Sequence, residues 1–183
     1  MRVWRICQQR FVADALEGTG GVHVSGRWHR MGHPIVYTST HASLAALEVL
    51  VHADPLTAPG DLRLLAIEVP DDIKIESLDT KSLPKDWRAL PAPEALQSRG
   101  TAWLRSARSA GLLVPSAIIE TERNLLLNPR HPDTKRVKVV ENRPFSFDPR
   151  LRAPGLDHAP ANAPARKSTH IRTTRATRRK HDA

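Results

Sequence analysis

Residues 40–52 read THASLAALEVLVH, and this stretch has the spacing of one amphipathic helix. At about 100° per residue, Leu44, Leu47 and Val51 fall on one apolar stripe. Glu48 falls between them, so a carboxylate points into the face that should be buried. Because a buried carboxylate loses hydration that only a partner can restore, we expect Glu48 to meet a cation or a hydrogen-bond donor.

Strand-forming segments surround this helix in the sequence. Residues 3–7 and 34–39 have the alternation and the β-branched and aromatic content of strands, and Thr40 or Ser39 is the expected N-cap of the helix. Further elements are predicted as strands at 62–69, 73–76, 112–120 and 137–140, an edge strand at 145–148, and helices at 11–16 and at 93–110, the last ended by Gly111. Because strands and helices are mixed without a regular βαβ alternation, the fold class is predicted to be α+β.

The distribution of charge divides the chain into a body and a tail. A length of 183 residues favours a single domain. Residues 151–183 contain eight Lys or Arg against two Asp, a net charge of +6, which leaves +3 of the total of +9 for the rest of the chain. Apolar periodicity also ends near Arg150. We therefore predict a folded domain at 1–150 and a disordered basic tail at 151–183.

Composition and motif searches exclude several classes of protein. The sequence has no apolar run of transmembrane length and no signal-peptide pattern, and Cys7 is the single cysteine, so no intramolecular disulfide can form. These features fit a cytoplasmic protein without membrane contact. An HExxH motif and a Cys/His quartet are both absent, so no metal site is expected. Walker A, GxGxxG and GxSxG motifs are absent too, which argues against the usual kinase, dehydrogenase and hydrolase sites.

Four dispersed side chains remain as candidates for chemistry: Arg27, Tyr37, Glu48 and Ser116. Each has a structural alternative. Arg27 could be a surface arginine, Tyr37 a core residue with a satisfied hydroxyl, and Ser116 an ordinary strand serine. For Glu48 the alternative is a buried structural ion pair, because perturbed buried carboxylates occur in both roles.

The order of several short motifs resembles the RES-domain family, which is named for its arginine, glutamate and serine. The motifs are SGRW at 25–28, VYTS at 36–39, LAALEVLVH at 44–52, PSA at 115–117 and NLLLNP at 124–129. The resemblance extends from the N-terminus to about residue 150 and leaves the tail outside. One departure is His29, where the family usually has asparagine.

The resemblance implies a bacterial toxin of a type II toxin–antitoxin pair. Its implied fold is ADP-ribosyltransferase-like, with two packed, mainly antiparallel sheets, flanking helices and an NAD-binding cleft. Such toxins consume NAD+ by hydrolysis or phosphorolysis, or transfer ADP-ribose to a protein, and an Xre-type antitoxin blocks their active site. By position, the family's catalytic residues correspond to Arg27, Glu48 and Ser116, and its NAD+-binding residues to Arg27, Tyr37, Ser39 and Asn128.

The residue types suit cleavage of the bond between nicotinamide and ribose. This bond breaks through an oxocarbenium-like state, which a desolvated Glu48 carboxylate can stabilise. The planar fork of Arg27 can bind a phosphate or ribose oxygen, the ring of Tyr37 can stack on nicotinamide, and Ser116 can donate one positioning hydrogen bond. Nicotinamide leaves from a cationic state, so the reaction needs no metal and no strong general acid.

Three functions are therefore weighed. The first is an NAD+-consuming toxin that acts by hydrolysis or phosphorolysis. The second is an ADP-ribosyltransferase that uses the same site to modify a cellular protein. The third is a non-catalytic module that binds nucleic acid through the basic tail, although a tail of this composition can equally be a solubilising extension.

Overall fold

The structure is a computed structural model, and it describes residues 1–52 and 60–151. Its strands are β1 (Arg2–Gln8), β2 (Val36–Ser39), β3 (Leu62–Glu68), β4 (Ile75–Ser77), β5 (Gly111–Pro115), β6 (Arg123–Leu127) and β7 (Lys138–Pro144). Its α-helices are α1 (Gly20–His23), α2 (Ala42–Leu50) and α3 (Glu94–Ser106), and its 3₁₀ helices are Gln9–Phe11, Thr80–Ser82, Pro132–Arg136 and Pro149–Leu151. Apart from Leu151, the predicted tail lies outside the described residues.

The described strands form one seven-stranded sheet with the order β4-β5-β6-β2-β1-β3-β7. Neighbouring strands are antiparallel except β4 and β5, which are parallel. The predicted α+β class and the mainly antiparallel pairing are thereby confirmed. No helix in the described ranges is long and apolar enough to cross a membrane.

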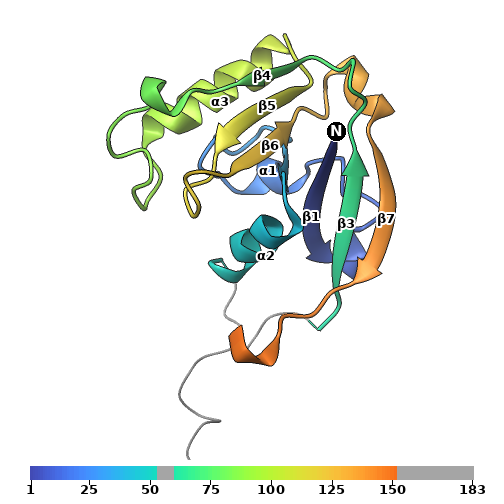
Figure 1. Cartoon of the computed structure of the whole chain (residues 1–183). Coiled ribbons are helices and arrows are strands. Elements are labelled where there is room, and N and C mark those ends of the chain that lie inside the picture. The colour runs from blue at the N-terminus through green and yellow to red at the C-terminus, as the bar shows by residue number, and fades with distance from the viewer. Residues whose placement is uncertain (53–59, 152–183) are drawn as a thin grey trace, which may run out of the picture. The chain divides into compact units, whose positions relative to one another are not determined.

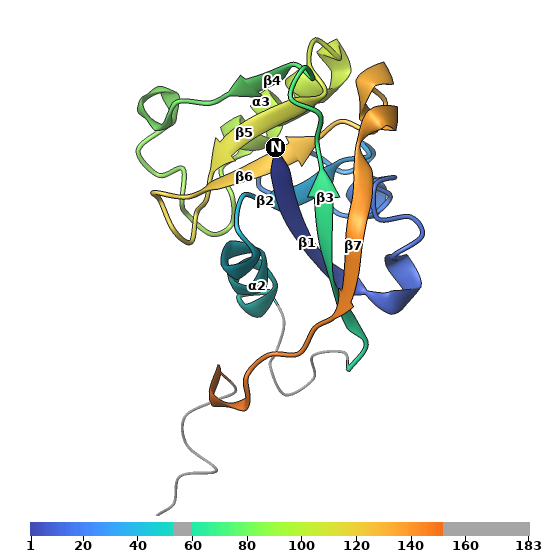
Figure 2. The same ribbon diagram turned by 45° about the vertical axis from the view of Figure 1, so that its right-hand side comes forward.

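The sheet has a weak joint between β2 and β1. These strands are paired at a single position, Trp4 with Ser39, whereas β1 is paired with β3 along its whole length. The β4-β5-β6-β2 half and the β1-β3-β7 half run in clearly different directions (Figures 1 and 2). The resemblance implied two packed sheets; the described strands instead form one sheet, because the Trp4–Ser39 pair joins its two halves. At the joint, Arg5 Nη1 donates to the Tyr37 carbonyl at 2.9 Å.

Three apolar clusters fill the space on the two faces of the sheet. One face carries Val3, Val36, Leu65, Ile67, Leu125 and Leu127. On the other face, α3 packs Leu96, Trp103 and Leu104 against Leu112 and Val114 of β5 and Leu126 of β6. The third cluster joins Ala45 of α2 to Ile6, Leu62 and Phe147. Residues 145–148 are therefore not the predicted edge strand; they cover the β1-β3 half through the side chain of Phe147.

Helix α3 ends earlier than the sequence suggests. Ala107 adopts the left-handed conformation with φ 44°, and Gly111, the predicted stop, is instead the first residue of β5. Inside the helix, Gly100 allows close contact with the chain at Trp28, because a Cβ at position 100 would lie 1.8 Å from the Trp28 carbonyl oxygen. The helix thus rests directly on the backbone that follows Arg27.

Two other predicted boundaries also move. The predicted helix at 11–16 is replaced by the 3₁₀ turn Gln9–Phe11 and irregular turns, since Gly18 at φ 65° redirects the chain. The predicted strand 112–120 ends at Pro115, whose ring has no N–H to continue a ladder. The chain turns at this point and returns as β6, which places Ser116 in the turn.

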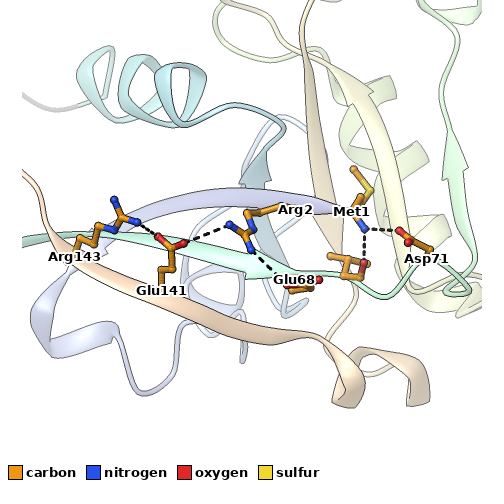
Figure 3. Close-up of polar contacts among 7 residues, drawn as sticks. Met1, Arg2, Glu68, Asp71, Glu141 and Arg143 are labelled. Carbon is orange, nitrogen blue, oxygen red and sulfur yellow. Dashed lines mark hydrogen bonds and ion pairs between the residues drawn. The ribbon is translucent and has the colours of Figure 1, made fainter.

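An exposed network of charges covers the strands of the β1-β3-β7 half (Figure 3). Arg2 pairs with Glu68 at 3.7 Å and with Glu141 at 3.3 Å, and Glu141 also binds Arg143. Exposed pairs of this kind contribute little stability. Because β7 is an edge strand, its charged side chains discourage pairing with another chain.

Candidate active site

Helix α2, which contains Glu48, contacts β1 and β2. The helix lies below β6 and beside β1 (Figures 1 and 2). Leu44 and Ala45 are its buried residues. Val51, predicted to share the apolar stripe, is 57% exposed, because the helix packs on Ile6, Leu62 and Phe147 through another side, which carries Ala45, Ala46, Val49 and Leu50. The N-cap is His41 and makes no side-chain cap bond. The two predicted cap residues bind other groups: Thr40 Oγ1 donates to the Arg123 carbonyl at 2.9 Å, and Ser39 Oγ donates to Asn124 Oδ1 at 2.7 Å.

The Glu48 carboxylate is held by hydrogen-bond donors. Ser116 Oγ donates to Glu48 Oε1 at 3.1 Å, and Asn124 Nδ2 donates to the same oxygen at 2.6 Å. Among the described residues, Glu48 forms no ion pair within 4.0 Å. The predicted need for a partner is confirmed, and the partners are neutral.

Ser116 has a fixed hydroxyl. The residue is fully buried, and its Oγ accepts hydrogen bonds from the backbone N–H groups of Ile118 at 3.1 Å and Ile119 at 3.2 Å. With both acceptor positions occupied, the hydroxyl hydrogen is directed at Glu48. Within residues 1–52 and 60–151, no histidine is bonded to this oxygen, so Ser116 has the environment of a positioning donor rather than that of an activated nucleophile.

Asn124 is a member of the site that sequence reasoning did not single out. It lies on β6, opposite Ser39 of β2, and is 9% exposed. Since alternate residues of a strand share a face, Tyr37 and Ser39 project on the same side of the sheet as Asn124. The available signal was an amide at the start of an apolar strand, where a buried polar group requires partners.

Arg27 lies in the loop after α1 and holds a second loop in place. Its Nη1 donates to the carbonyl of Trp87 at 2.5 Å and to that of Ala89 at 3.2 Å, and its Nη2 donates to the Arg88 carbonyl at 3.4 Å. Burial lowers the pKa of Arg27, while the nearby Glu48 carboxylate acts in the opposite direction. The guanidinium is therefore within electrostatic range of Glu48 without forming an ion pair with it.

Tyr37 and His29 fasten the loop that carries Arg27. The Tyr37 hydroxyl accepts from the Trp28 N–H at 3.2 Å and lies 2.9 Å from His29 Nδ1. His29 is 3% exposed, with Nε2 3.0 Å from the Val24 carbonyl and Nδ1 accepting from the Gly26 N–H. Burial raises the pKa of Tyr37 far above its usual range and lowers the pKa of His29. Both groups are therefore neutral near pH 7, and His29, the departure from the family pattern, is a buried loop residue.

Asn128 is not brought together with the other predicted residues. It lies just beyond the far end of β6, about 13 Å along the chain direction from Asn124 at roughly 3.3 Å per residue. Its Nδ2 donates to the Leu104 carbonyl at 3.0 Å, and its Oδ1 accepts from the Arg130 N–H at 3.1 Å. With 1% exposure, this amide fastens the end of α3 to the turn after β6.

The candidate residues do not line the larger hollow of the domain and are not grouped as metal ligands. A hollow of about 320 Å³ lies elsewhere on the domain and is lined by Gln9, Gly60, Asp61, Leu62, Arg63, Pro144, Phe145 and Ser146, none of them a candidate site residue. Within residues 1–52 and 60–151, no three His, Cys, Asp or Glu side chains are grouped so that they could hold a metal ion.

The fold is α+β, and its candidate site is the Glu48 carboxylate with the Arg27 guanidinium and the Tyr37 phenol nearby. The RES domain family model matches residues 2–148. The Toxin Res of Pseudomonas putida is 44% identical over 154 residues, covering 82% of this chain and 99% of that protein. The Toxin Res of Yersinia enterocolitica is 40% identical over 153 residues, covering 83% of this chain and 100% of that protein. The chain belongs to the RES domain family and is related over its whole matched length to members named as toxins.

Two further comparisons extend this result. The Prs ADP-ribosylating toxin of a Sphingobium species is 41% identical over 152 residues, covering 81% of this chain and 94% of that protein. The M. tuberculosis MbcT-MbcA toxin–antitoxin complex contains a chain of similar fold, with a TM-score of 0.64, 21% identity, and coverage of 79% of this chain and 84% of that chain. At this identity the solved structure supports the fold alone.

Proposed function

We propose that the protein is the toxin of a toxin–antitoxin pair and that it cleaves the nicotinamide–ribose bond of NAD+. Family membership and the names of the relatives support the toxin assignment. The observation that carries the chemistry is the Glu48 carboxylate, which is fixed by two neutral donors on one oxygen and has a guanidinium in electrostatic range.

The geometry suits stabilisation of a developing positive charge. When nicotinamide leaves, positive charge builds on the ribose ring, and a carboxylate without a salt-bridge partner retains its full field for that charge. In this proposal Glu48 Oε2 accepts a ribose hydroxyl and faces the ring. Arg27 uses the N–H groups that are not bonded to the 87–89 carbonyls to bind a phosphate or ribose oxygen. The Tyr37 ring flanks the nicotinamide.

The acceptor of the ADP-ribosyl group separates two forms of the proposal. Water or inorganic phosphate as acceptor gives an NAD+ glycohydrolase or phosphorylase. A protein side chain as acceptor gives an ADP-ribosyltransferase, and the name of the Sphingobium relative, an ADP-ribosylating toxin at 41% identity, supports this second form. Both forms share the bond that breaks and the residues that stabilise its breaking.

A protein antitoxin is the proposed partner. The resemblance to RES toxins implies an Xre-type antitoxin that blocks the active site, and a chain of the same fold has been solved in a toxin–antitoxin complex. Co-expression with the cognate antitoxin should suppress the growth defect that the toxin causes. Copurification of the two proteins as a stable complex is the matching measurement.

The deciding experiment is incubation of the purified protein with NAD+. Three arms contain buffer alone, inorganic phosphate, and a cell extract supplied with biotin-labelled NAD+. Mass spectrometry then identifies nicotinamide together with ADP-ribose, a phosphorylated ADP-ribose or a labelled protein. Nicotinamide release in at least one arm is expected, and its absence from all three arms would contradict the proposed reaction.

The substitution Glu48→Gln separates a catalytic from a structural carboxylate. Glutamine keeps the volume and an Oε1 acceptor for Ser116 and Asn124 but removes the charge. We expect nicotinamide release to fall on the order of 10²-fold, as when one preorganised electrostatic contact is lost. Breaking a buried ion pair would cost roughly 3–5 kcal/mol, but Glu48 has only neutral partners among the described residues, so thermal stability should be unchanged or raised. A stable variant with the wild-type rate would remove Glu48 from the mechanism.

A further inference from the structure

A chain of two side-chain hydrogen bonds leads from β2 to Glu48. Ser39 Oγ donates to Asn124 Oδ1 at 2.7 Å, and Asn124 Nδ2 donates to Glu48 Oε1 at 2.6 Å. Ser39 and Asn124 are direct cross-strand partners in the β2-β6 ladder, and both are almost fully buried. The backbone positions of the chain are thus set by the sheet, and only the Asn124 amide has to be oriented.

The neighbours determine which way that amide points. An ionised carboxylate only accepts hydrogen bonds, so the NH₂ group must face Glu48 and the carbonyl oxygen must face the Ser39 hydroxyl. A reversed amide would place its carbonyl oxygen against the carboxylate. The Glu48 carboxylate therefore selects the orientation of Asn124 in which its NH₂ group donates to Glu48, and the Ser39 hydroxyl, which can donate, satisfies the amide oxygen in that orientation.

Both donors to the carboxylate use the same oxygen. Ser116 Oγ and Asn124 Nδ2 bind Oε1, and in the described part of the chain no hydrogen bond is formed to Oε2. Ser116 comes from the turn after β5 and Asn124 from β6, so the two bonds fix Oε1 from different elements. A carboxylate fixed at one oxygen presents the other in a defined direction.

We propose that Asn124 is a positioning residue for Glu48, that Ser39 holds the Asn124 amide in place through its carbonyl oxygen, and that Oε2 is the oxygen that meets the ribose. This inference rests on the proposed NAD+ cleavage and assigns a role to two residues outside the arginine–glutamate–serine set. Asn124 acts only through Glu48 and does not touch the substrate. Ser39, assigned by resemblance to NAD+ binding, acts through Asn124.

The first test measures kcat and KM for nicotinamide release in single variants. Asn124→Ala and the isosteric Asn124→Asp should lower kcat about 10²-fold and change KM by about twofold or less, because the ground state of the complex keeps its other contacts. Ser39→Ala should lower kcat less, by about 5- to 10-fold, since Asn124 keeps its bond to Glu48 and loses only the donor that holds its carbonyl oxygen. Thr38→Val is the matched control, because the buried Thr38 hydroxyl binds the Leu125 carbonyl on the same strand pair.

The second test is a double-mutant cycle with Glu48→Gln. If Asn124 works through the carboxylate, Asn124→Ala should lower the residual rate of the Glu48→Gln protein by no more than about twofold. A further 10²-fold loss in that background would mean that Asn124 acts independently of Glu48, and it would overturn the inference. If Asn124→Ala does not fold, Asn124→Asp and Ser39→Ala complete the same cycle.

The failure of this inference can be told from failure of the proposed function. A wild-type protein that releases no nicotinamide contradicts the proposed function itself. In a second outcome, the wild-type protein turns over, Glu48→Gln does not, and Asn124→Ala has the wild-type rate. This outcome would support the proposed function and exclude Asn124 as a positioning residue. A loss of rate in Thr38→Val equal to that in Ser39→Ala would likewise reduce the Ser39 effect to a disturbance of the strand pair.

Discussion

Glu48 and Arg27 lie close enough to influence each other, yet the structure keeps them apart. Each binds other partners: neutral side chains for Glu48 and backbone carbonyls for Arg27. An ion pair between them would cancel the field that a developing cation on the ribose needs. Hydrogen bonds from neutral donors stabilise the carboxylate and leave its charge in place.

Substitution of Arg27 by lysine should affect both activity and local structure. Lysine keeps the charge but cannot reproduce the planar fork that reaches the carbonyls of 87–89. We expect nicotinamide release to fall about 10²-fold and unfolding free energy to fall by about 1–2 kcal/mol. Kinetics measures the first effect and urea unfolding the second, and faster hydrogen exchange at residues 87–89 is expected as the local consequence of the lost bonds.

Arg99→Lys is the matched control for this substitution. Arg99 Nη1 donates to the Ser82 carbonyl at 3.0 Å, so its substitution removes a similar bond away from Glu48. If turnover and hydrogen exchange at 87–89 are both unchanged in Arg27→Lys, Arg27 neither supports turnover nor holds this loop.

His29 should make the stability of the domain dependent on pH. Burial lowers its pKa, so the folded protein holds the ring neutral at pH values where the unfolded chain is protonated. The unfolded state therefore binds more protons below about pH 6.5, and the stability present above that pH is lost as the pH falls toward the folded pKa. In His29→Asn, the decrease in melting temperature between pH 7.5 and 5.5 should be smaller than in the wild type. An exposed-site variant, His23→Asn, should keep the wild-type decrease.

At the scale of elements, the contact between α3 and the Arg27 loop depends on Gly100. Alanine normally gains about 1 kcal/mol over glycine inside a helix. Here its Cβ would lie 1.8 Å from a backbone oxygen of Trp28, which cannot move without shifting the loop. We expect Gly100→Ala to destabilise the protein by about 3 kcal/mol in chemical denaturation. Gly20→Ala, where a Cβ meets nothing within 4 Å, should be close to neutral.

The sequence predicted β2, α2 and β3 well because each has a strong local pattern. The same local pattern identified Glu48 as a polar residue on an apolar helix face, and the resemblance assigned Ser116 and Tyr37 to the same site. Contacts between distant segments were not predictable in this way. The Ser39–Asn124 bond depends on β2-β6 register, and register cannot be derived from one isolated strand.

Other differences arise where tertiary contacts override a local signal. Ala107 takes the left-handed position that glycine favours, so the C-terminus of α3 was placed too late. Asn128 belongs to a motif that also contains Asn124, but four residues of strand separate them and only Asn124 reaches Glu48. A short motif does not show, without this geometry, which of its two amides lies beside Glu48.

For the whole molecule, we predict that the basic tail is dispensable for turnover. The family model ends at residue 148, and the relatives match 81–83% of this chain while being covered over 94–100% of their own length. A protein that ends at Leu151 should release nicotinamide within about twofold of the full-length rate. A folded truncated protein without turnover would contradict this prediction. Any nucleic-acid binding by the full chain should weaken steeply with salt and be absent after truncation.

The single backbone pair between β1 and β2 has a mechanical consequence. Helix α2 packs its apolar side chains on the β1-β3 half, while Ser116 and Asn124 belong to the other half. Together with the Arg5–Tyr37 bond, the bonds to Glu48 therefore connect the two halves across a joint that the ladder holds at one position. By reciprocity, a ligand that tightens these bonds stabilises the closed joint. A change that opens the joint therefore weakens the binding of that ligand by the same free energy.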